Sequence, residues 1–157
     1  MGTLLLLSVF FTGCAKEKHV SFTLFDRALH KEKLVVHDGV YYRRGRKIPY
    51  SGGIFAVYST GGLEMEAILE DGVPDGKIIY WYESGQKQKE VLYIAGKREG
   101  VSTLWYETGQ TKKIVTYENN QMNGISISWD HTGQKQYEKY YRNNRMESSL
   151  RYTNEVE

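Results

Sequence analysis

Apolar and polar residues follow a fixed order along this chain, which is clearest between residues 76 and 99. Residues 78–82 are mainly apolar and aromatic, residues 83–86 are polar and include a glycine, and residues 87–94 form a second, weakly alternating run. Two runs of about seven residues joined by glycine-bearing loops are typical of a β-hairpin, because glycine adopts the positive φ that tight turns require. The pattern therefore predicts two strands in this stretch.

This order recurs at an interval of 24 residues. Two sets of glycines keep the interval without a gap: Gly52, Gly76, Gly100 and Gly124, and then Gly61, Gly85, Gly109 and Gly133. We interpret them as the structural turns of four full units, 52–75, 76–99, 100–123 and 124–147. Asn120 and Asn144 replace Gly96 in the later units, and asparagine tolerates the left-handed region that a turn needs. After the last unit the pattern decays, and Ser148 replaces the next glycine.

Successive hairpins with tight turns pair with their sequence neighbours. The predicted fold class is therefore all-β, a repeat array of β-hairpins that forms an elongated, twisted, antiparallel meander sheet. The composition agrees, because 13 Tyr and 16 Gly against 2 Pro favour hairpins over helices. A short fixed period also implies that each unit buries its apolar side chains against its neighbours, so function is expected on a shared extended surface.

Aromatic residues recur on both predicted faces of the sheet. The sixth position of the unit is expected to form a ladder on the buried face: Val57, Trp81, Trp105 and Trp129, beside Phe55, Ile79, Thr103 and Ile127. The opposite face is expected to carry Tyr58, Tyr82, Tyr106 and Asp130. Aromatic ladders of this kind stabilise a repeat array. Because one sheet cannot bury both sides, part of this surface is also a candidate binding face, consisting of Trp81, Trp105, Trp129, Tyr82 and Tyr106.

The N-terminal residues suggest where the protein is located in the cell. Residues 4–11 (LLLLSVFF) form an apolar run far shorter than the roughly 20 residues of a membrane span, as in a secretory signal. The sequence Phe11-Thr12-Gly13-Cys14 resembles the lipobox of bacterial lipoproteins, which implies lipid attachment at Cys14. We predict a lipoprotein-type signal peptide at 1–13, a tether or pre-repeat segment at 14–35 and the repeat domain at 36–157. The alternative is a buried strand with a free core cysteine.

The repeat unit also carries a family resemblance. Trp-Tyr-x-x-Gly, followed about eight residues after the glycine by a tyrosine and then by a Gly or Asn turn, resembles the variant MORN repeat. This repeat occurs in bacterial proteins that are often filed as antitoxins of the YwqK family, and the resemblance covers residues 40–152. It implies a long, twisted antiparallel sheet.

Patterns that carry chemistry are weak in this chain, so we predict no enzyme, no catalytic residue, no cofactor and no metal site. His37-Asp38 is better explained by a turn at Asp38-Gly39, and the single cysteine rules out an intramolecular disulfide. Glu66, Glu90 and Glu138 share a repeat position and are interpreted as a solvated stripe, which Ile114 interrupts. The basic run at 43–47 is interpreted as a charged turn, with a lipid headgroup contact as the alternative.

These features predict a non-enzymatic, lipid-anchored repeat protein that presents an extended β-surface for protein interaction at the bacterial cell envelope. The expected partners are an unidentified protein and, through Cys14, the membrane. A net charge of +2 gives no reason to expect nucleic acid. The alternatives are a cytoplasmic, antitoxin-like inhibitor of a toxin, a membrane-lipid-binding module, and an enzyme acting on envelope polymers. The terminal strand near Leu150 is a further candidate for pairing with another copy.

Overall fold

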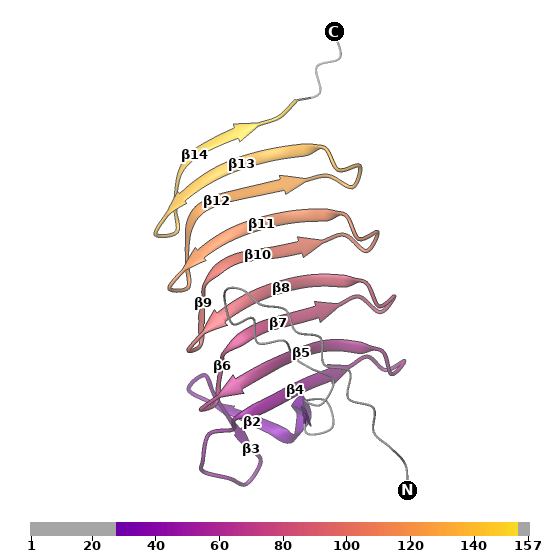
Figure 1. Cartoon of the computed structure of the whole chain (residues 1–157), viewed down its shortest axis with the longest axis vertical. Coiled ribbons are helices and arrows are strands. Elements are labelled where there is room, and N and C mark those ends of the chain that lie inside the picture. Colours follow the sequence, from indigo (N-terminus) through magenta and orange to yellow (C-terminus); the bar gives the residue numbers. More distant parts are fainter. Residues whose placement is uncertain (1–27, 154–157) are drawn as a thin grey trace, which may run out of the picture.

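The computed structural model describes residues 28–153, which form one long, open β-sheet with a small hairpin at its N-terminal end (Figure 1). The main sheet has 12 strands, and its central path runs β1-β4-β5-β7-β8-β10-β11-β12-β13-β14. From β4 onward each strand pairs antiparallel with the next strand on this path. The all-β meander predicted from the 24-residue period is confirmed.

The strand bounds follow the repeat. The central path consists of β1 (Leu29–His30), β4 (Gly52–Val57), β5 (Leu63–Glu70), β7 (Gly76–Trp81), β8 (Lys87–Ile94), β10 (Gly100–Trp105), β11 (Thr111–Glu118), β12 (Gln121–Trp129), β13 (Lys135–Arg142) and β14 (Arg145–Arg151). The two-residue strands β6 (Val73–Pro74) and β9 (Lys97–Arg98) extend the hairpins of β5 and β8. In the third unit the corresponding segment is merged into the start of β12.

The N-terminal end of the sheet is covered by residues that lie outside the 24-residue repeat. Strand β1 pairs parallel with β4, the 3-10 turn η2 (Lys31–Lys33) follows, and β2 (Leu34–His37) pairs with β3 (Val40–Arg43) in a separate two-stranded sheet. Residues 28–35 were expected in the tether but are folded onto the array. The boundary expected at residue 36 therefore lies at or before residue 28.

The two sets of repeated glycines lie in different places. Gly61, Gly85, Gly109 and Gly133 lie in the loops between strands, whereas Gly52, Gly76, Gly100 and Gly124 lie in strands β4, β7, β10 and β12, so the interpretation of the latter set as turns is wrong. All eight nevertheless have positive φ, from 69° at Gly100 to 141° at Gly52. Asn120 and Asn144 have φ of 71° and 67°, so asparagine takes the left-handed position of Gly96 as expected. The predicted turn at Asp38-Gly39 is also present, with φ of 50° and 80°.

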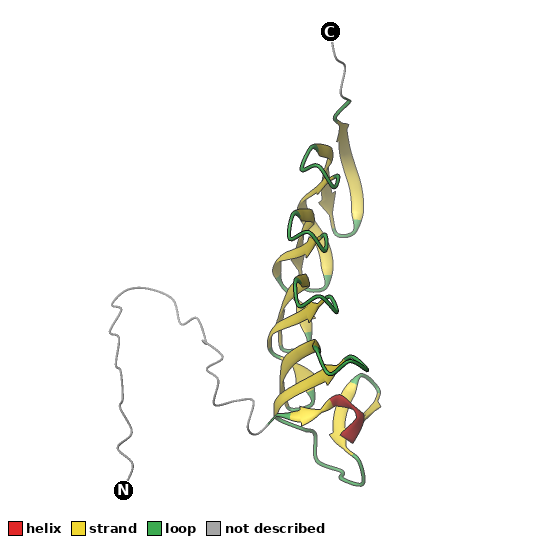
Figure 2. Cartoon of the chain, turned by 90° about the vertical axis from the view of Figure 1, so that its right-hand side faces the viewer, coloured by secondary structure: helices red, strands yellow, loops and turns green. Residues whose placement is uncertain are grey.

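A β-bulge recurs at the same place in every full unit. The register shifts between Ala56 and Val57, and the shift recurs between Tyr80 and Trp81, Leu104 and Trp105, and Ser128 and Trp129. A bulge strengthens the local right-handed twist. Seen from the side, the array is a single twisted layer with the β2–β3 hairpin lying on one side of it (Figure 2).

The buried side chains lie on the face that we expected to be open. Alternation along β7 puts Ile79 and Trp81 on one side and Ile78 on the other, and Ile78 is buried whereas Trp81 is only partly buried. The same holds in the next units, where Ser102 and Ser126 are buried and Trp105 and Trp129 are partly buried. The prediction that the tryptophans lie on the buried face is therefore wrong. We call their side of the sheet the Trp face, and the other side, which carries Ile54, Ile78, Ser102 and Ser126, the hairpin face.

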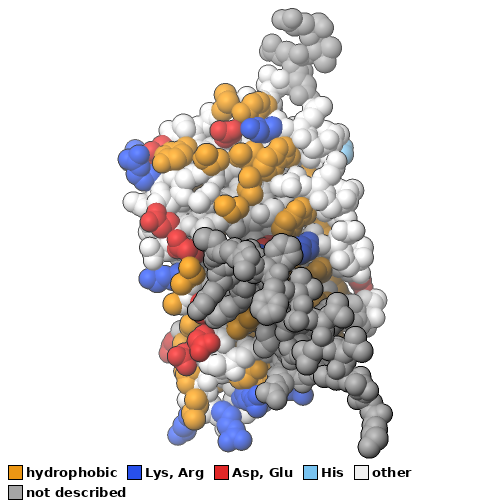
Figure 3. Space-filling view, in the orientation of Figure 1, with side chains coloured by type: hydrophobic (Ala, Val, Ile, Leu, Met, Phe, Trp, Pro, Cys, Tyr) orange, Lys and Arg blue, Asp and Glu red, His pale blue; other side chains and the backbone are white. Residues whose placement is uncertain are grey.

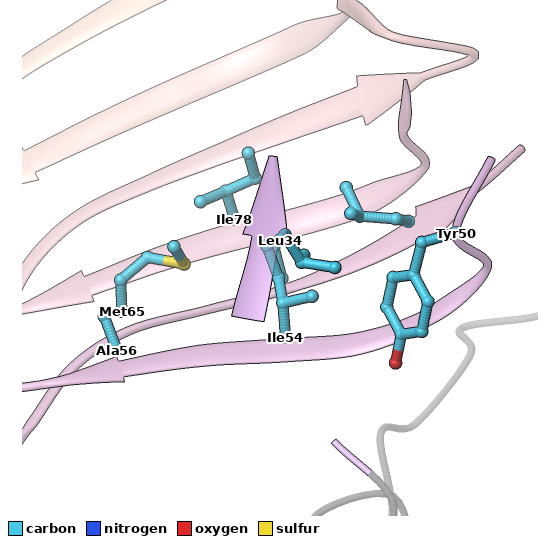
Figure 4. Close-up of a cluster of buried hydrophobic side chains, with 8 residues drawn as sticks. Leu34, Tyr50, Ile54, Ala56, Met65 and Ile78 are labelled. Carbon is cyan, nitrogen blue, oxygen red and sulfur yellow. The ribbon is translucent and has the colours of Figure 1, made fainter. Parts of the chain in front are cut away.

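The reason is the β2–β3 hairpin, which packs on the hairpin face of the first unit. Leu34 from β2 lies in one buried cluster with Ile54, Met65, Leu69 and Ile78 (Figure 4). Backbone hydrogen bonds fix the hairpin there, with Tyr41 N donating to Gly72 O over 2.8 Å and Gly72 N to Tyr50 O over 3.0 Å. The core therefore sits at the N-terminal end of the array.

Candidate interaction surface

Three tyrosines of the predicted binding face connect one unit to the next. Each lies in the turn after the first strand of its unit, where Tyr58 Oη donates a hydrogen bond to the backbone oxygen of Trp81 at 2.6 Å. The same bond recurs from Tyr82 to Trp105 at 2.8 Å and from Tyr106 to Trp129 at 2.9 Å. Burial raises the pKa of Tyr58, with smaller contributions from Glu64, Glu83 and Glu107, which keeps the phenol protonated as a donor. These hydroxyls are occupied within the array, and a contact role for the rings of Tyr82 and Tyr106 stays a prediction.

Asp130 replaces the tyrosine in the last full unit, where no further tryptophan carbonyl follows. Its carboxylate instead accepts hydrogen bonds within its own turn, from Thr132 Oγ1 at 2.6 Å, Thr132 N at 2.9 Å and Gln134 N at 3.0 Å. Its second oxygen accepts from Gln136 Nε2 at 3.0 Å. The hydrogen bond from the Thr132 hydroxyl, with those from the Gln134 and Thr132 amides, lowers the pKa of Asp130 to about 2. The series of hydrogen bonds from tyrosine hydroxyls to the next unit therefore ends at Asp130.

The turns at the other end of the strands are connected in a similar way. Asn120 Oδ1 accepts from Arg98 N at 2.8 Å, and Asn144 Oδ1 accepts from Met122 N at 2.7 Å. In the second unit the backbone amide of Gly96 donates to Pro74 O at 2.8 Å, without a side-chain acceptor. The asparagines thus add a hydrogen bond to the turn that glycine makes with its backbone alone.

The Trp face carries apolar side chains that remain exposed. Alternation places Val101 and Ile125 on the same face as Trp105 and Trp129, and their exposed fractions are 57% and 48%. The register continues this face through Tyr140 and Leu150, which are 40% and 56% exposed. Figure 3 shows hydrophobic side chains gathered over β12–β14. The sequence analysis did not assign these four residues to the binding face and named Leu150 only for strand pairing, although Val101 and Ile125 stand four positions before a tryptophan and so share its side of the strand.

Several charged side chains of the Trp face form ion pairs with one another. Glu90 accepts from Lys87 at 2.8 Å and Lys77 at 2.9 Å, and its side chain is only 21% exposed. Glu138 pairs with Lys135 at 3.1 Å. Burial alone would raise the pKa of the Glu90 carboxyl, but hydrogen bonds from Lys87 and Lys77 outweigh burial and lower it. The interpretation of these glutamates as a solvated stripe is therefore wrong for Glu90, because its repeat position lies in the middle of the sheet.

A shallow depression of about 400 Å³ lies at the C-terminal end, between β12, β13 and β14. Ile125, Tyr140 and Leu150 contribute its apolar lining and Glu138 a carboxylate. Strand β14 bounds it with all seven residues exposed, and no strand within residues 28–153 pairs with its outer edge. An unpaired edge is a template for another strand. That β14 pairs with a second copy stays a prediction.

Several predicted features fall outside this surface. Cys14 and the signal-type residues 1–13 lie outside the described residues. Within residues 28–153 no helix is long and apolar enough to cross a membrane. In the same range no group of three His, Cys, Asp or Glu side chains is arranged to hold a metal ion. The basic run at 43–47 is an exposed turn in which the Arg43 guanidinium lies 5.2 Å from the ring centre of Tyr50.

The comparison with protein families agrees with this geometry. Residues 74–95, 98–119 and 122–143 match the family profile described as the MORN repeat variant. Three tandem units of this chain are thus similar to that repeat. The first match covers strands β7 and β8, the second covers β10 and β11, and the third covers β12 and β13. A comparison with curated proteins finds no match. The MORN repeat is a non-catalytic repeat type that suits a role in protein or membrane interaction.

Proposed function

We propose that this chain is a non-enzymatic repeat scaffold that binds a protein partner through its Trp face at the bacterial cell envelope, where a lipid on Cys14 anchors it. The observation that supports this most is the series of exposed apolar side chains on one face of the array. Val101, Ile125, Tyr140 and Leu150 remain 40–57% exposed on strands that are otherwise well paired. Contiguous exposed apolar surface with a polar rim is characteristic of protein interaction sites.

The electrostatics of the Trp face favour a protein over a charged polymer. Lys77, Lys87 and Lys135 are each paired with a glutamate of the same face, so this surface offers little net charge to a polyanion. Aromatic residues and apolar anchors, by contrast, dominate the binding energy of protein interfaces. Trp105 and Trp129, partly buried beside Val101 and Ile125, are expected to widen the contact area.

The test is recovery of a partner from envelope extract by the full chain. We expect the double variant Ile125→Lys/Leu150→Lys to lose at least about 90% of the recovered partner, because two lysines in an apolar contact leave charges desolvated. The matched control is Val36→Lys/Ile48→Lys, which makes the same change at two apolar residues that are 50% and 80% exposed away from the Trp face. Equal loss by the control, or no loss by the double variant, would contradict the proposed contact face.

The anchor is tested separately. A Cys14→Ser variant should move from the membrane fraction to the soluble fraction, because single and multiple acyl chains contribute roughly 0.8 kcal/mol per buried CH₂. Recovery of the wild-type chain from the cytosol would contradict the envelope location and favour an antitoxin-like role there.

A further inference from the structure

The hairpin face of the later units has a different chemistry from the Trp face. Its centre is a row of small side chains, Ser102, Ser126, Val91 and Val115, which are 2–5% exposed although no described segment packs over them. They are buried by the larger side chains beside them. The register places Tyr93, Tyr117 and Tyr141 on this face at one border of the row. No hydrogen bond from their hydroxyls occurs within residues 28–153.

The cations on this face have no ion-pair partner. Lys89, Lys113 and Lys139 alternate with residues of the Trp face and so lie on the hairpin face. None of them lies within salt-bridge distance of a carboxylate in the described part of the chain. The four glutamates of strands β7 to β14 lie on the other side: Glu90, Glu118, Glu138 and Glu147, the last paired with Arg142 at 3.4 Å. The two faces therefore differ in how their lysines are balanced: the lysines of the Trp face at Lys77, Lys87 and Lys135 pair with glutamates, whereas the hairpin-face lysines have no glutamate on their own face of these strands.

These groups recur at the spacing of the repeat. Lys89 and Lys113 occupy equivalent positions on β8 and β11, and Tyr93 and Tyr117 do the same, with one strand between each pair. Two strand spacings amount to about 9.6 Å. A polyproline II helix has three residues per turn and rises about 9.3 Å in that turn, so every third side chain points the same way at nearly the same interval.

We propose that the hairpin face of the second and third units binds an acidic polypeptide segment in the polyproline II conformation, with a carboxylate at every third residue. Two successive carboxylates pair with Lys89 and Lys113, and the rings of Tyr93 and Tyr117 border the helix and offer their free hydroxyls to its carbonyl groups. The equivalent position on β13 is Tyr137, and Lys139 stands two residues beyond it. Aromatic rows are the surfaces on which such helices dock elsewhere, because a preformed polyproline II helix loses little entropy on binding. This inference extends the proposed protein-binding function to a second face.

The chain itself shows that an extended segment fits this face. In the first unit β2 crosses the hairpin face, and Leu34 is buried to 7% exposure against Ile54 and Ile78. Ile78 of the second unit, with Tyr80 and Tyr93 beside it, still borders this cluster, whereas Ser102 and Ser126 take the same position in the third and fourth units. Among the described residues the cluster covers the first unit and the near side of the second, and the face beyond it is open to another chain.

The test uses three fluorescein-labelled peptides and the purified full-length chain, with binding followed by fluorescence anisotropy at low salt. The first peptide repeats Glu-Pro-Pro four times, the second repeats Lys-Pro-Pro, and the third repeats Glu-Gly-Gly, which has the charge of the first without its preformed helix. We expect Glu-Pro-Pro to bind at least about tenfold more tightly than either of the other two. Added salt should weaken its binding, because the ion pairs are solvent-exposed.

Variants locate the binding site. Lys89→Glu/Lys113→Glu should weaken Glu-Pro-Pro binding about tenfold or more, because two attractive pairs become repulsive. Arg46→Glu/Lys47→Glu makes the same change in net charge in the exposed turn at the N-terminal end and should change binding less than about twofold. Equal affinity for Glu-Pro-Pro and Glu-Gly-Gly, an unchanged double variant, or binding to anionic lipid vesicles without binding to the peptide would overturn the proposal. Because no Trp-face residue is altered, failure here is distinct from failure of the envelope partner test.

Discussion

The ladder from tyrosine to tryptophan carbonyl makes a quantitative prediction about stability. Replacing Tyr82 with phenylalanine keeps the ring and removes only the hydroxyl that donates to Trp105 O at 2.8 Å. A hydrogen bond of this kind contributes about 1 kcal/mol net to the free energy of unfolding. The equivalent sites stand about 9.6 Å apart, so their effects should add. The triple variant Tyr58→Phe/Tyr82→Phe/Tyr106→Phe is expected to lose about 3 kcal/mol.

The assay is urea unfolding followed by tryptophan fluorescence and circular dichroism, with the midpoint compared at constant slope. The matched control is Tyr140→Phe, since the Tyr140 hydroxyl is exposed and makes no hydrogen bond within residues 28–153. A Tyr82→Phe midpoint equal to that of Tyr140→Phe would refute the ladder. The pH dependence has a definite sign, because the pKa of Tyr58 is raised by burial. The contribution of Tyr58 is complete below the ordinary tyrosine pKa and is lost as pH rises through the raised value.

Three further predictions concern the ends of the strands and of the array. The carboxyl group of Asp130, followed by the NMR signal of its carboxyl carbon, should titrate with a midpoint near pH 2. The stabilising effect of Asp130 is present above the ordinary pKa of aspartate and is lost as pH falls through about 2. A midpoint near pH 4 would contradict the hydrogen-bonded turn. Asn120→Ala should destabilise the array by about 1–2 kcal/mol in urea unfolding, and Asn120→Gly by less, because glycine keeps the φ of 71° and loses only the side-chain hydrogen bonds from Arg98 N and Nε. If β14 pairs with a second copy, light scattering should show a dimer that Ser149→Pro disrupts and Thr132→Pro does not; a monomer at all concentrations would contradict that pairing.

The sequence predicted those parts of the fold that repeat. The interval between Gly76 and Gly100 predicted the strands and turns of each unit, because a local turn residue and its neighbouring runs determine a hairpin. It could not predict which face is buried. That outcome depends on Leu34, which reaches Ile54 and Ile78 through a hairpin outside the period. The bulky tryptophans suggested a core, whereas the buried residues of the later units are the small Ser102 and Ser126.

The candidate site was predicted only in part. Trp105 and Trp129 do lie on the face that we propose for partner binding, but Ile125 and Leu150, which are more exposed, were not predicted to belong to it. Asp130 was placed in the row of tyrosines without a reason for the exchange; the structure shows that its carboxylate accepts hydrogen bonds within its own turn instead of donating to the next unit. The partner of Tyr82 is likewise 23 residues away and becomes visible only in the folded array.

The central claim is that the exposed Trp face of this array is a protein-binding surface. The most direct test places a photo-crosslinking amino acid at position 140 on that face, in cells that make the full chain, and compares it with the same amino acid at the exposed turn residue Thr132. We predict one discrete protein adduct from position 140 that is absent from position 132 and is lost in the Ile125→Lys/Leu150→Lys background. The same adduct from both positions, or none from position 140, would contradict the claim.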